Sequence, residues 1–489
     1  MVTSTKESGS YYQRLHALDV VTHAEKFGGP VVISGSYGGT AFSAYHQLNR
    51  AALLLINTHV VVAFGQHCNN EGYGWVFSYN KTALASGSEA VYNTDPRSIH
   101  GSVWMGGSGV AADSSGNLFF ATGDGDFDGV TYFGDSIIKL GSPSGGTFPF
   151  LDYFTPFNQA KLDYCDYDVG SGGVLLLPDL PPGSAHQHLL VQAGKEGTIY
   201  LIDRDKMGNY CSGCASDTNI VQEQSDVLTG LWGSPAYWNG NIYFGSTEEP
   251  AYNGCGNNIA DHIKAYSFNS GGDGLLSTFP TSQTPETFVW PNPSPSVSSN
   301  GTANGIVWAL ENSSYGSACC GVLHAYDATN LATELYNSNT NSGRDQLGGA
   351  IKFSVPTVAN GKVYVGTQNQ LTVLSTGLPS ASISPTHLFF SYPCDNPPNP
   401  QTVTLTNNGP GALMLESFPV QYTKGYGFVV SPLTCSVGSH MQPGSSCTLS
   451  ISYGGPTGSN IGTLEVNVTA ANSPETVSLS GFTGSCGPP

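Results

Sequence analysis

The chain has 489 residues, of which 39% are hydrophobic and 11% aromatic, a composition that supports two or three folded domains with a large core. Its 35 acidic and 16 basic residues give a net charge of −19, which repels phosphate backbones and anionic lipids, so we expect no nucleic-acid partner. No apolar run reaches the roughly 20 residues that cross a bilayer, so we expect no transmembrane segment.

The cysteine content indicates the compartment. Eleven cysteines are typical of an oxidising, extracytoplasmic setting, where disulfides persist. The first residues, MVTSTKESGS, have neither the basic nor the apolar region of a secretory signal. We therefore expect an extracellular, periplasmic or cell-surface protein whose export signal has been lost from this chain with its N-terminus.

Short β-branched and aromatic runs alternate with Gly, Asn, Asp and Pro turns, and helical periodicity is almost absent, which predicts an all-β fold. The runs repeat. A strand, an Asn-Gly turn and an alternating apolar strand are predicted at 233–246 (GSPAYWNGNIYFGS) and 354–367 (SVPTVANGKVYVGT). Looser copies lie at 52–65, 109–123 and 296–310.

A second element follows each copy and is predicted to be a hairpin with its turn at an aspartate or asparagine. These hairpins are expected at 14–27, 74–92, 197–208, 261–274 and 321–336. One strand pair and one hairpin make a four-stranded sheet, and such a unit repeated roughly every 45 to 65 residues is typical of a β-propeller. We predict a propeller over residues 1–376.

The predicted hairpins resemble the tryptophan-docking repeat of the quinoprotein alcohol dehydrogenases. That repeat is an Ala-x-Asp-x-x-Thr-Gly pattern ending in Trp, and it is kept here as Ala17, Asp19, Thr22 and Phe27. The resemblance to this family, built of PQQ-like repeats, implies a propeller of the eight-bladed type. About six to seven blades fit into this chain, so the resemblance implies an incomplete ring.

The pattern changes after the propeller. We predict a linker over 377–382 and, over 383–489, alternating strands at the spacing of a β-sandwich. This segment resembles the immunoglobulin-like domains of the Hydin and abnormal-spindle type. The resemblance implies a disulfide between Cys435 and Cys447 and a role as spacer or adhesive module.

An acidic loop follows the run GNLFF. Asp124, Asp126 and Asp128, with Gly129 at the sixth position and Asp135 at the twelfth, have the D-x-D-x-D-G spacing of a calcium loop. Calcium takes about six to eight oxygen ligands, which alternate carboxylates on a loop can supply. A solvated acidic turn between two strands is the alternative, and the sequence leaves both open.

The resemblance to the quinoproteins gives this loop a third interpretation. ATGD (121–124) matches a family stretch whose Asn helps hold calcium beneath the quinone, which implies that role for Asp124. CDYDVG (165–170) matches the stretch with the catalytic aspartate, which implies Asp166 or Asp168.

Two further roles follow from the same resemblance. Lys195 matches the basic residue that contacts the quinone, and Glu71 matches the carboxylate ligand of the calcium ion. The set implies that calcium polarises pyrroloquinoline quinone (PQQ), that an aspartate takes the proton of an alcohol, and that Lys195 stabilises the reduced quinone. The family's stacking tryptophan is expected just before residue 111, where this chain has GGSGV.

Three functions remain in view. The sequence favours a secreted or surface-associated binding and scaffold propeller with a calcium loop, whose ligand is a carbohydrate, a small molecule or a protein. The alternative is a calcium- and PQQ-dependent oxidoreductase acting on alcohols or sugars. A polysaccharide lyase or hydrolase is a further alternative, since paired carboxylates near a propeller axis serve such reactions.

Overall fold

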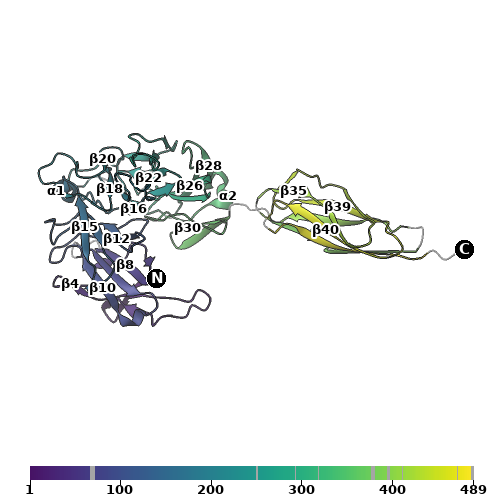
Figure 1. Ribbon diagram of the computed structural model, residues 1–489, viewed down its shortest axis with the longest axis horizontal. Coiled ribbons are helices and arrows are strands. Elements are labelled where there is room, and N and C mark those ends of the chain that lie inside the picture. Colours follow the sequence, from purple (N-terminus) through teal and green to yellow (C-terminus); the bar gives the residue numbers. More distant parts are fainter. Residues whose placement is uncertain are drawn as a thin grey trace. The chain divides into compact units, whose positions relative to one another are not determined.

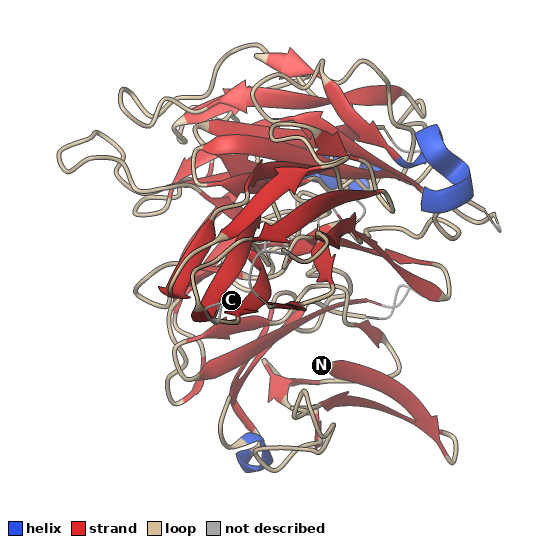
Figure 2. Ribbon diagram, turned by 90° about the vertical axis from the view of Figure 1, so that its right-hand side faces the viewer, coloured by secondary structure: helices blue, strands red, loops and turns tan. Residues whose placement is uncertain are grey.

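The structure is a computed structural model that describes residues 1–66, 72–248, 252–291, 293–317, 319–375, 380–393, 397–409, 411–470 and 472–485. Strands predominate, and the helices are short segments (Figure 2). The chain divides into two compact units, one of Met1–Thr357 with Val365–Thr372 and one of Val358–Tyr364 with Val373–Pro489. No helix in the described ranges is long and apolar enough to cross a membrane.

The first unit consists of successive small sheets, many of them antiparallel and four-stranded, an arrangement consistent with a β-propeller. Figure 1 shows these sheets following one another around an arc, from β8 through β15 and β22 to β26. The first two sheets contain β1 (Val2–Glu7), β2 (Ser10–Leu15) and β3 (Val31–Val32), and then β6 (Gln47–Leu48), β7 (Leu54–Ile56), β8 (His59–Gln66), β9 (Trp75–Asn80), β10 (Ser88–Asn93) and β14 (Gly146–Thr147).

The remaining sheets follow in chain order. The third and fourth contain β11 (Ala111–Ala112), β12 (Leu118–Ala121), β13 (Ile137–Leu140), β15 (Phe150–Thr155) and β19 (Asn209–Tyr210), and then β16 (Leu175–Leu176), β17 (Leu189–Ala193), β18 (Ile199–Asp203) and β20 (Gln222–Gln224). The fifth and sixth contain β21 (Ala236–Trp238), β22 (Asn241–Thr247), β23 (Ala260–Ser267) and β24 (Ser282–Gln283), and then β25 (Ser296–Asn300), β26 (Ala303–Glu311), β27 (Val322–Asp327) and β28 (Glu334–Asn337).

A further three-stranded sheet and several short elements complete this part of the chain. They are β29 (Thr357–Ala359), β30 (Lys362–Thr367) and β31 (Gln370–Ser375), the pair β4 (Ser36–Tyr37) and β5 (Thr40–Ala41), and the helices η1 (Leu84–Ser86), α1 (Gln159–Cys165), η2 (Ser338–Asn341) and α2 (Ser342–Asp345).

The Asn-Gly turns form where the sequence predicts them. Asn239 and Gly240 join β21 to β22 with φ of +46° and +80°, and Asn360 and Gly361 join β29 to β30 with φ of +50° and +68°. Two consecutive residues with positive φ make the tight turn that matches the twist of a hairpin, and Asn-Gly is the sequence that adopts it most easily. The predicted strand pairs at 233–246 and 354–367 are confirmed.

Three of the predicted second hairpins are wrong. β2 pairs with β3 at residues 31–32, beyond the predicted end at 27. β18 pairs with β20, and the 18 residues between them hold the Cys211–Cys214 disulfide instead of the tight turn predicted within 197–208. β23 likewise pairs with β24 at residues 282–283, beyond the predicted end at 274. The short outer strands carry little apolar pattern, so the sequence alone does not locate them.

The innermost strands of different sheets begin close to one another. The Gly106 N–H donates to the Ser171 carbonyl (2.8 Å), and the Ser234 hydroxyl donates to the Gly106 carbonyl (2.9 Å). A Cβ at Gly106 would collide with the Trp232 carbonyl, so only glycine fits there. Segments from the third, fourth and fifth sheets thus meet at a shared centre.

The second unit has two sheets over one apolar core. One contains β32 (Ala381–Ser384), β34 (Gln401–Asn407), β37 (Phe428–Pro432) and β39 (Ser446–Tyr453); the other contains β33 (His387–Tyr392), β35 (Leu413–Ser417), β36 (Val420–Lys424), β38 (His440–Met441), β40 (Gly458–Val468) and β41 (Glu475–Thr483). Leu449 from the first sheet and Leu464 from the second are buried in the same cluster. Cys435 and Cys447 are joined by a disulfide. β32 starts at Ala381, inside the segment predicted as a linker.

Candidate functional site

Three loops of the first unit bring acidic side chains together around one lysine. Asp124 follows β12, Asp166 and Asp168 follow α1, and Lys195 follows β17. The Lys195 ammonium nitrogen lies 2.8 Å from Asp166 Oδ1 and 2.6 Å from Asp168 Oδ2. The sequence assigned these four residues to one site, and the structure places them together; we call them the carboxylate site.

The carboxylate site is closed on the side of Lys195 and open on the side of Asp166. The side chains of Lys195 and Asp168 are 5% and 6% exposed, whereas that of Asp166 is 37% exposed. The Lys195 ammonium also lies 4.5 Å from the centre of the Trp232 ring, a cation–π contact that helps hold it in place. A ligand from solvent therefore meets Asp166 first.

Asp124 is held by its backbone and by a histidine. The Asp124 N–H donates to Asp168 Oδ1 (2.8 Å), and Asp124 Oδ2 lies 3.1 Å from His100 Nδ1. The preceding residue, Gly123, is in close contact with this pair, since a Cβ there would collide with Asp168 Oδ1 and lie 3.0 Å from Trp104 Nε1. Glycine at position 123 is what lets the Asp124 loop reach Asp168.

The site holds more negative than positive charge. Burial raises the pKa of Asp168 above its ordinary range; the Lys195 ammonium opposes this shift, and the charges of Asp166 and Asp124 add to it. Burial also raises the pKa of Asp135, and the charges of Asp168 and Asp124 raise it further. One lysine thus faces a group of carboxylates that repel one another.

The donor set suits a hard cation. Ligand oxygens of Asp124, Asp166 and Asp168 all lie within 4.8 Å of one another. The neighbouring Asp135 is fully buried, and its Oδ2 has no hydrogen-bond partner. Carboxylate oxygens are the ligands that calcium prefers, so the three clustered aspartates fit this ion chemically.

Of the other residues of the D-x-D-x-D-G spacing, Asp126 and Asp128 make their contacts outside this cluster, and Asp135 adjoins it without belonging to the three clustered aspartates. Asp126 is exposed and accepts a hydrogen bond from the Ser98 hydroxyl (2.5 Å). Asp128 Oδ1 accepts the N–H groups of the next turn, from residues 130 to 132. Asp135 Oδ1 accepts the Val169 N–H (3.2 Å). Glu71, the other predicted ligand, lies outside the described residues.

A tryptophan that the sequence analysis did not place in the site adjoins it. Trp104 precedes residue 111 by seven positions, and its ring is covered by the Arg50 guanidinium, 4.3 Å from the ring centre. Arg50 also lies 4.7 Å from the Phe353 ring. Trp104 is only 8% exposed, so its indole offers no open face on which a flat cofactor could stack. A quinone bound as the family resemblance implies does not fit these residues.

The chain has little sequence similarity to known proteins. No protein-family model matches the chain, and no curated protein matches it. Among solved structures, it is similar to quinohemoprotein alcohol dehydrogenase ADHIIG of Pseudomonas putida HK5, with 14% identity and a TM-score of 0.42 over 74% of this chain and 61% of that one. The chain thus spans less than two thirds of the length of ADHIIG.

Two further solved structures are similar to the chain at a comparable level. Sqt1 of Saccharomyces cerevisiae is 11% identical, with a TM-score of 0.41 over 77% of this chain and 81% of that one. The Cps50 (Swd1) β-propeller domain of Myceliophteria thermophila is 10% identical, with a TM-score of 0.39 over 77% and 99% of the two chains. Similarities at this level carry no argument about activity.

Proposed function

We propose that the protein is a secreted or cell-surface β-propeller that binds a ligand or partner and is stabilised by calcium held at the carboxylate site. The observation that carries the proposal is the convergence of Asp124, Asp166 and Asp168, with ligand oxygens within 4.8 Å of one another and a single lysine among them. A divalent cation relieves the repulsion of three clustered carboxylates. The disulfides support an oxidising compartment.

The finer architecture is part of this proposal. The successive small antiparallel sheets support a propeller, for which we propose the eight-bladed, PQQ-like type, and the two sheets over one core support an immunoglobulin-like sandwich. Such a sandwich acts as a spacer or adhesive module. The ligand is a carbohydrate, a small molecule or a protein, and we expect neither nucleic acid nor a membrane-spanning segment.

Calcium titration followed by thermal melting tests the proposal. Calcium that binds only the folded state stabilises the wild-type protein by about 2.7 kcal/mol at 100 times its dissociation constant. Asp168→Asn and Asp166→Asn remove ligand charge and are expected to abolish this gain. Asp126→Asn is the matched control from the same acidic loop, since the Asp126 carboxylate lies outside the cluster and accepts the Ser98 hydroxyl, and it keeps the gain.

Two results would overturn the calcium proposal. One is a wild-type midpoint that does not move with calcium. The other is a gain that survives in both Asp166→Asn and Asp168→Asn but is lost in Asp126→Asn, which would return calcium to the D-x-D-x-D-G loop.

A quinoprotein oxidoreductase is the second candidate. The observation in its favour is that Asp124, Asp168 and Lys195, which the family resemblance selects from three separate segments, lie at one site. The Arg50 guanidinium on the Trp104 ring counts against it. Incubation with calcium and PQQ decides between the two functions: a bound-quinone absorbance with dye reduction by alcohols or aldoses would establish the oxidoreductase, and neither is expected.

A further inference from the structure

A second cluster of acidic residues surrounds a buried histidine in the sixth sheet. His324 lies on β27, Glu311 ends β26, Glu334 begins β28, and Glu286 follows the fifth sheet. The His324 side chain is 5% exposed, and each of the glutamates is about one third exposed. The cluster therefore joins two neighbouring sheets and remains accessible to small ions.

The two ring nitrogens of His324 have different surroundings. Nδ1 lies 2.8 Å from Glu334 Oε1 and 3.4 Å from Glu286 Oε1, whereas Nε2 lies 3.4 Å from Glu311 Oε2. Ligands about 2.1 Å from a tetrahedral metal ion are about 3.4 Å apart, which is the distance from Nδ1 to Glu286 Oε1. Glu334 Oε1, at the hydrogen-bond distance of 2.8 Å, would move outward to admit the ion. A metal-binding histidine usually donates its other ring N–H to a carboxylate. Glu311 has this position, because its Oε2 faces His324 Nε2.

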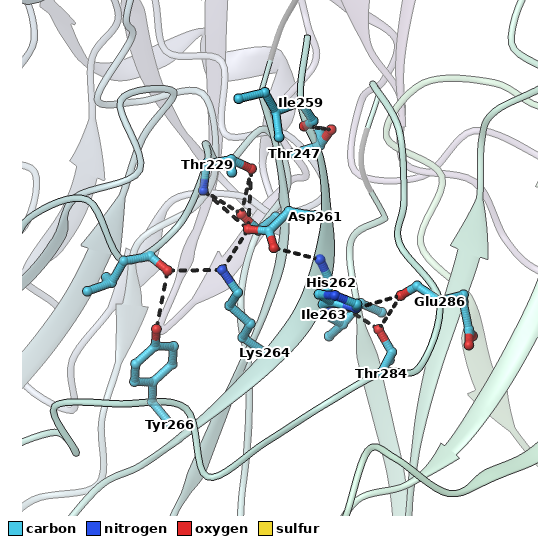
Figure 3. Close-up of polar contacts among 12 residues, drawn as sticks. Thr229, Thr247, Ile259, Asp261, His262, Ile263, Lys264, Tyr266, Thr284 and Glu286 are labelled. Carbon is cyan, nitrogen blue, oxygen red and sulfur yellow. Dashed lines mark hydrogen bonds and ion pairs between the residues drawn. The ribbon is translucent and has the colours of Figure 1, made fainter. Parts of the chain in front are cut away.

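The glutamates that face Nδ1 are held in position by neutral groups. Asn337 Nδ2 donates to Glu334 Oε1 (3.1 Å). The backbone carbonyl of Glu286 accepts hydrogen bonds from His262 Nδ1 (3.0 Å) and the Thr284 hydroxyl (2.9 Å), as Figure 3 shows. Glu286 Oε1 is buried and accepts no hydrogen bond. These contacts hold the Glu334 carboxylate and the Glu286 backbone in place without neutralising either carboxylate.

The equivalent position in the fifth sheet holds an ion pair in which the charges balance. Lys264 of IKAYS (263–267) corresponds to His324 of LHAYD (323–327), each on the third strand of its sheet. Lys264 Nζ lies 2.7 Å from Asp261 Oδ2, so one ammonium balances one carboxylate (Figure 3). Around His324, three carboxylates face one imidazole, which leaves a net charge of −2 even when the imidazole is protonated.

We propose that His324, Glu286 and Glu334 bind a divalent first-row transition metal ion through Nδ1 and two carboxylates, with Glu311 positioning the imidazole. Mixed imidazole and carboxylate ligands suit ions such as Zn²⁺. Binding replaces the proton on Nδ1 by the metal ion and releases that proton to solvent. This site is separate from the carboxylate site and does not depend on the proposed function.

Calorimetric titration of the metal-free full chain with Zn²⁺, in excess calcium, tests the site. The wild-type protein is expected to bind one ion here with proton release, which appears as a buffer-dependent enthalpy. Glu334→Gln removes a ligand and lowers the affinity at least tenfold, and Glu311→Gln lowers it about 10- to 100-fold. His186→Ala is the matched control, since His186 Nδ1 lies 2.8 Å from the single carboxylate of Asp203.

Circular dichroism of each metal-free variant establishes that it is folded before titration. A wild-type protein that binds no Zn²⁺ would overturn the proposal. Loss of affinity in His186→Ala, with Glu311→Gln and Glu334→Gln unchanged, would also overturn it by assigning the ion to surface histidines. If Glu334→Gln fails to fold, Glu311→Gln with its unchanged ligand set still decides the outcome.

Discussion

Asp95 is a carboxylic acid whose ionised form is destabilised by burial. It is fully buried beside the acidic loop, and neither of its carboxylate oxygens accepts a hydrogen bond of normal geometry. Burial raises its pKa to about 8, and the Asp126 carboxylate adds to this shift, against the opposing effects of the Asp126 backbone N–H and His100. At neutral pH the folded protein therefore holds Asp95 mainly protonated, whereas the unfolded chain ionises it.

The penalty follows from this difference in pKa. The pKa of the folded state is raised above the ordinary value of 3.8, so the folded state binds the extra proton, and stability falls as pH rises from about 4 to about 8. One pKa unit is worth about 1.4 kcal/mol, so the protonated Asp95 costs about 4 kcal/mol at pH 7 and about 2 kcal/mol at pH 5. Asp95→Asn keeps the shape, carries no charge in either state and removes this cost.

Urea unfolding of the wild-type protein and Asp95→Asn at pH 5 and pH 7 measures the effect. The variant is expected to be more stable at both pH values, and its advantage grows by about 2 to 3 kcal/mol from pH 5 to pH 7. Asp273→Asn, at an exposed turn far from Asp95 in the sequence, is the matched control and changes the free energy of unfolding by less than about 0.5 kcal/mol. An advantage that is absent at pH 7, or that does not grow with pH, refutes the reasoning.

Two further predictions concern the framework of the carboxylate site. Lys195→Met leaves Asp166 and Asp168 without their ammonium and is expected to destabilise the calcium-free protein by about 3–5 kcal/mol in urea unfolding. Lys161→Met, the control, removes an exposed ion pair and costs at most about 1 kcal/mol. Equal losses of stability in the two variants would contradict the prediction. Cys165→Ser opens a disulfide that has a sequence separation of 90 residues and ties α1 to the fifth sheet. We expect the free energy of unfolding to fall by about 3–5 kcal/mol and the calcium-induced rise in melting temperature to become smaller. An unchanged melting midpoint would contradict this prediction.

The inner parts of each sheet follow from the sequence, and the outer parts do not. The first two strands are joined by turns such as Asn239–Gly240, whose backbone requirement selects the residues. The outermost strands β20 and β24 have three and two residues, too short for a recognisable period. α1 was not predicted, because seven residues with only Leu162 and Cys165 as buried apolar side chains give no helical stripe.

The family resemblance selected residues that lie together in the candidate site. The D-x-D-x-D-G spacing also selected residues that lie outside it. Asp124, Asp168 and Lys195 were selected by short stretches of resemblance, and they converge. The calcium spacing selected Asp128, whose carboxylate instead closes its own turn by accepting N–H groups two to four residues ahead. Such a local contact is the ordinary alternative for aspartate in a loop. Trp104 was missed as a neighbour of the site because only the folded chain brings it to Gly123.

The balance of charge separates structural carboxylates from candidate metal ligands in this fold. Asp261 has one lysine, Lys264, at 2.7 Å, and nothing is left for a cation to neutralise. Asp124, Asp166 and Asp168 share one lysine, and three glutamates share His324, so each of these clusters retains excess negative charge. Because the repeated sheets offer equivalent strand positions, a histidine in place of the lysine, or further carboxylates around it, leaves an excess of negative charge for a cation to neutralise. Metal response should therefore follow the local excess of acid over base, and the Asp261 pair should show none.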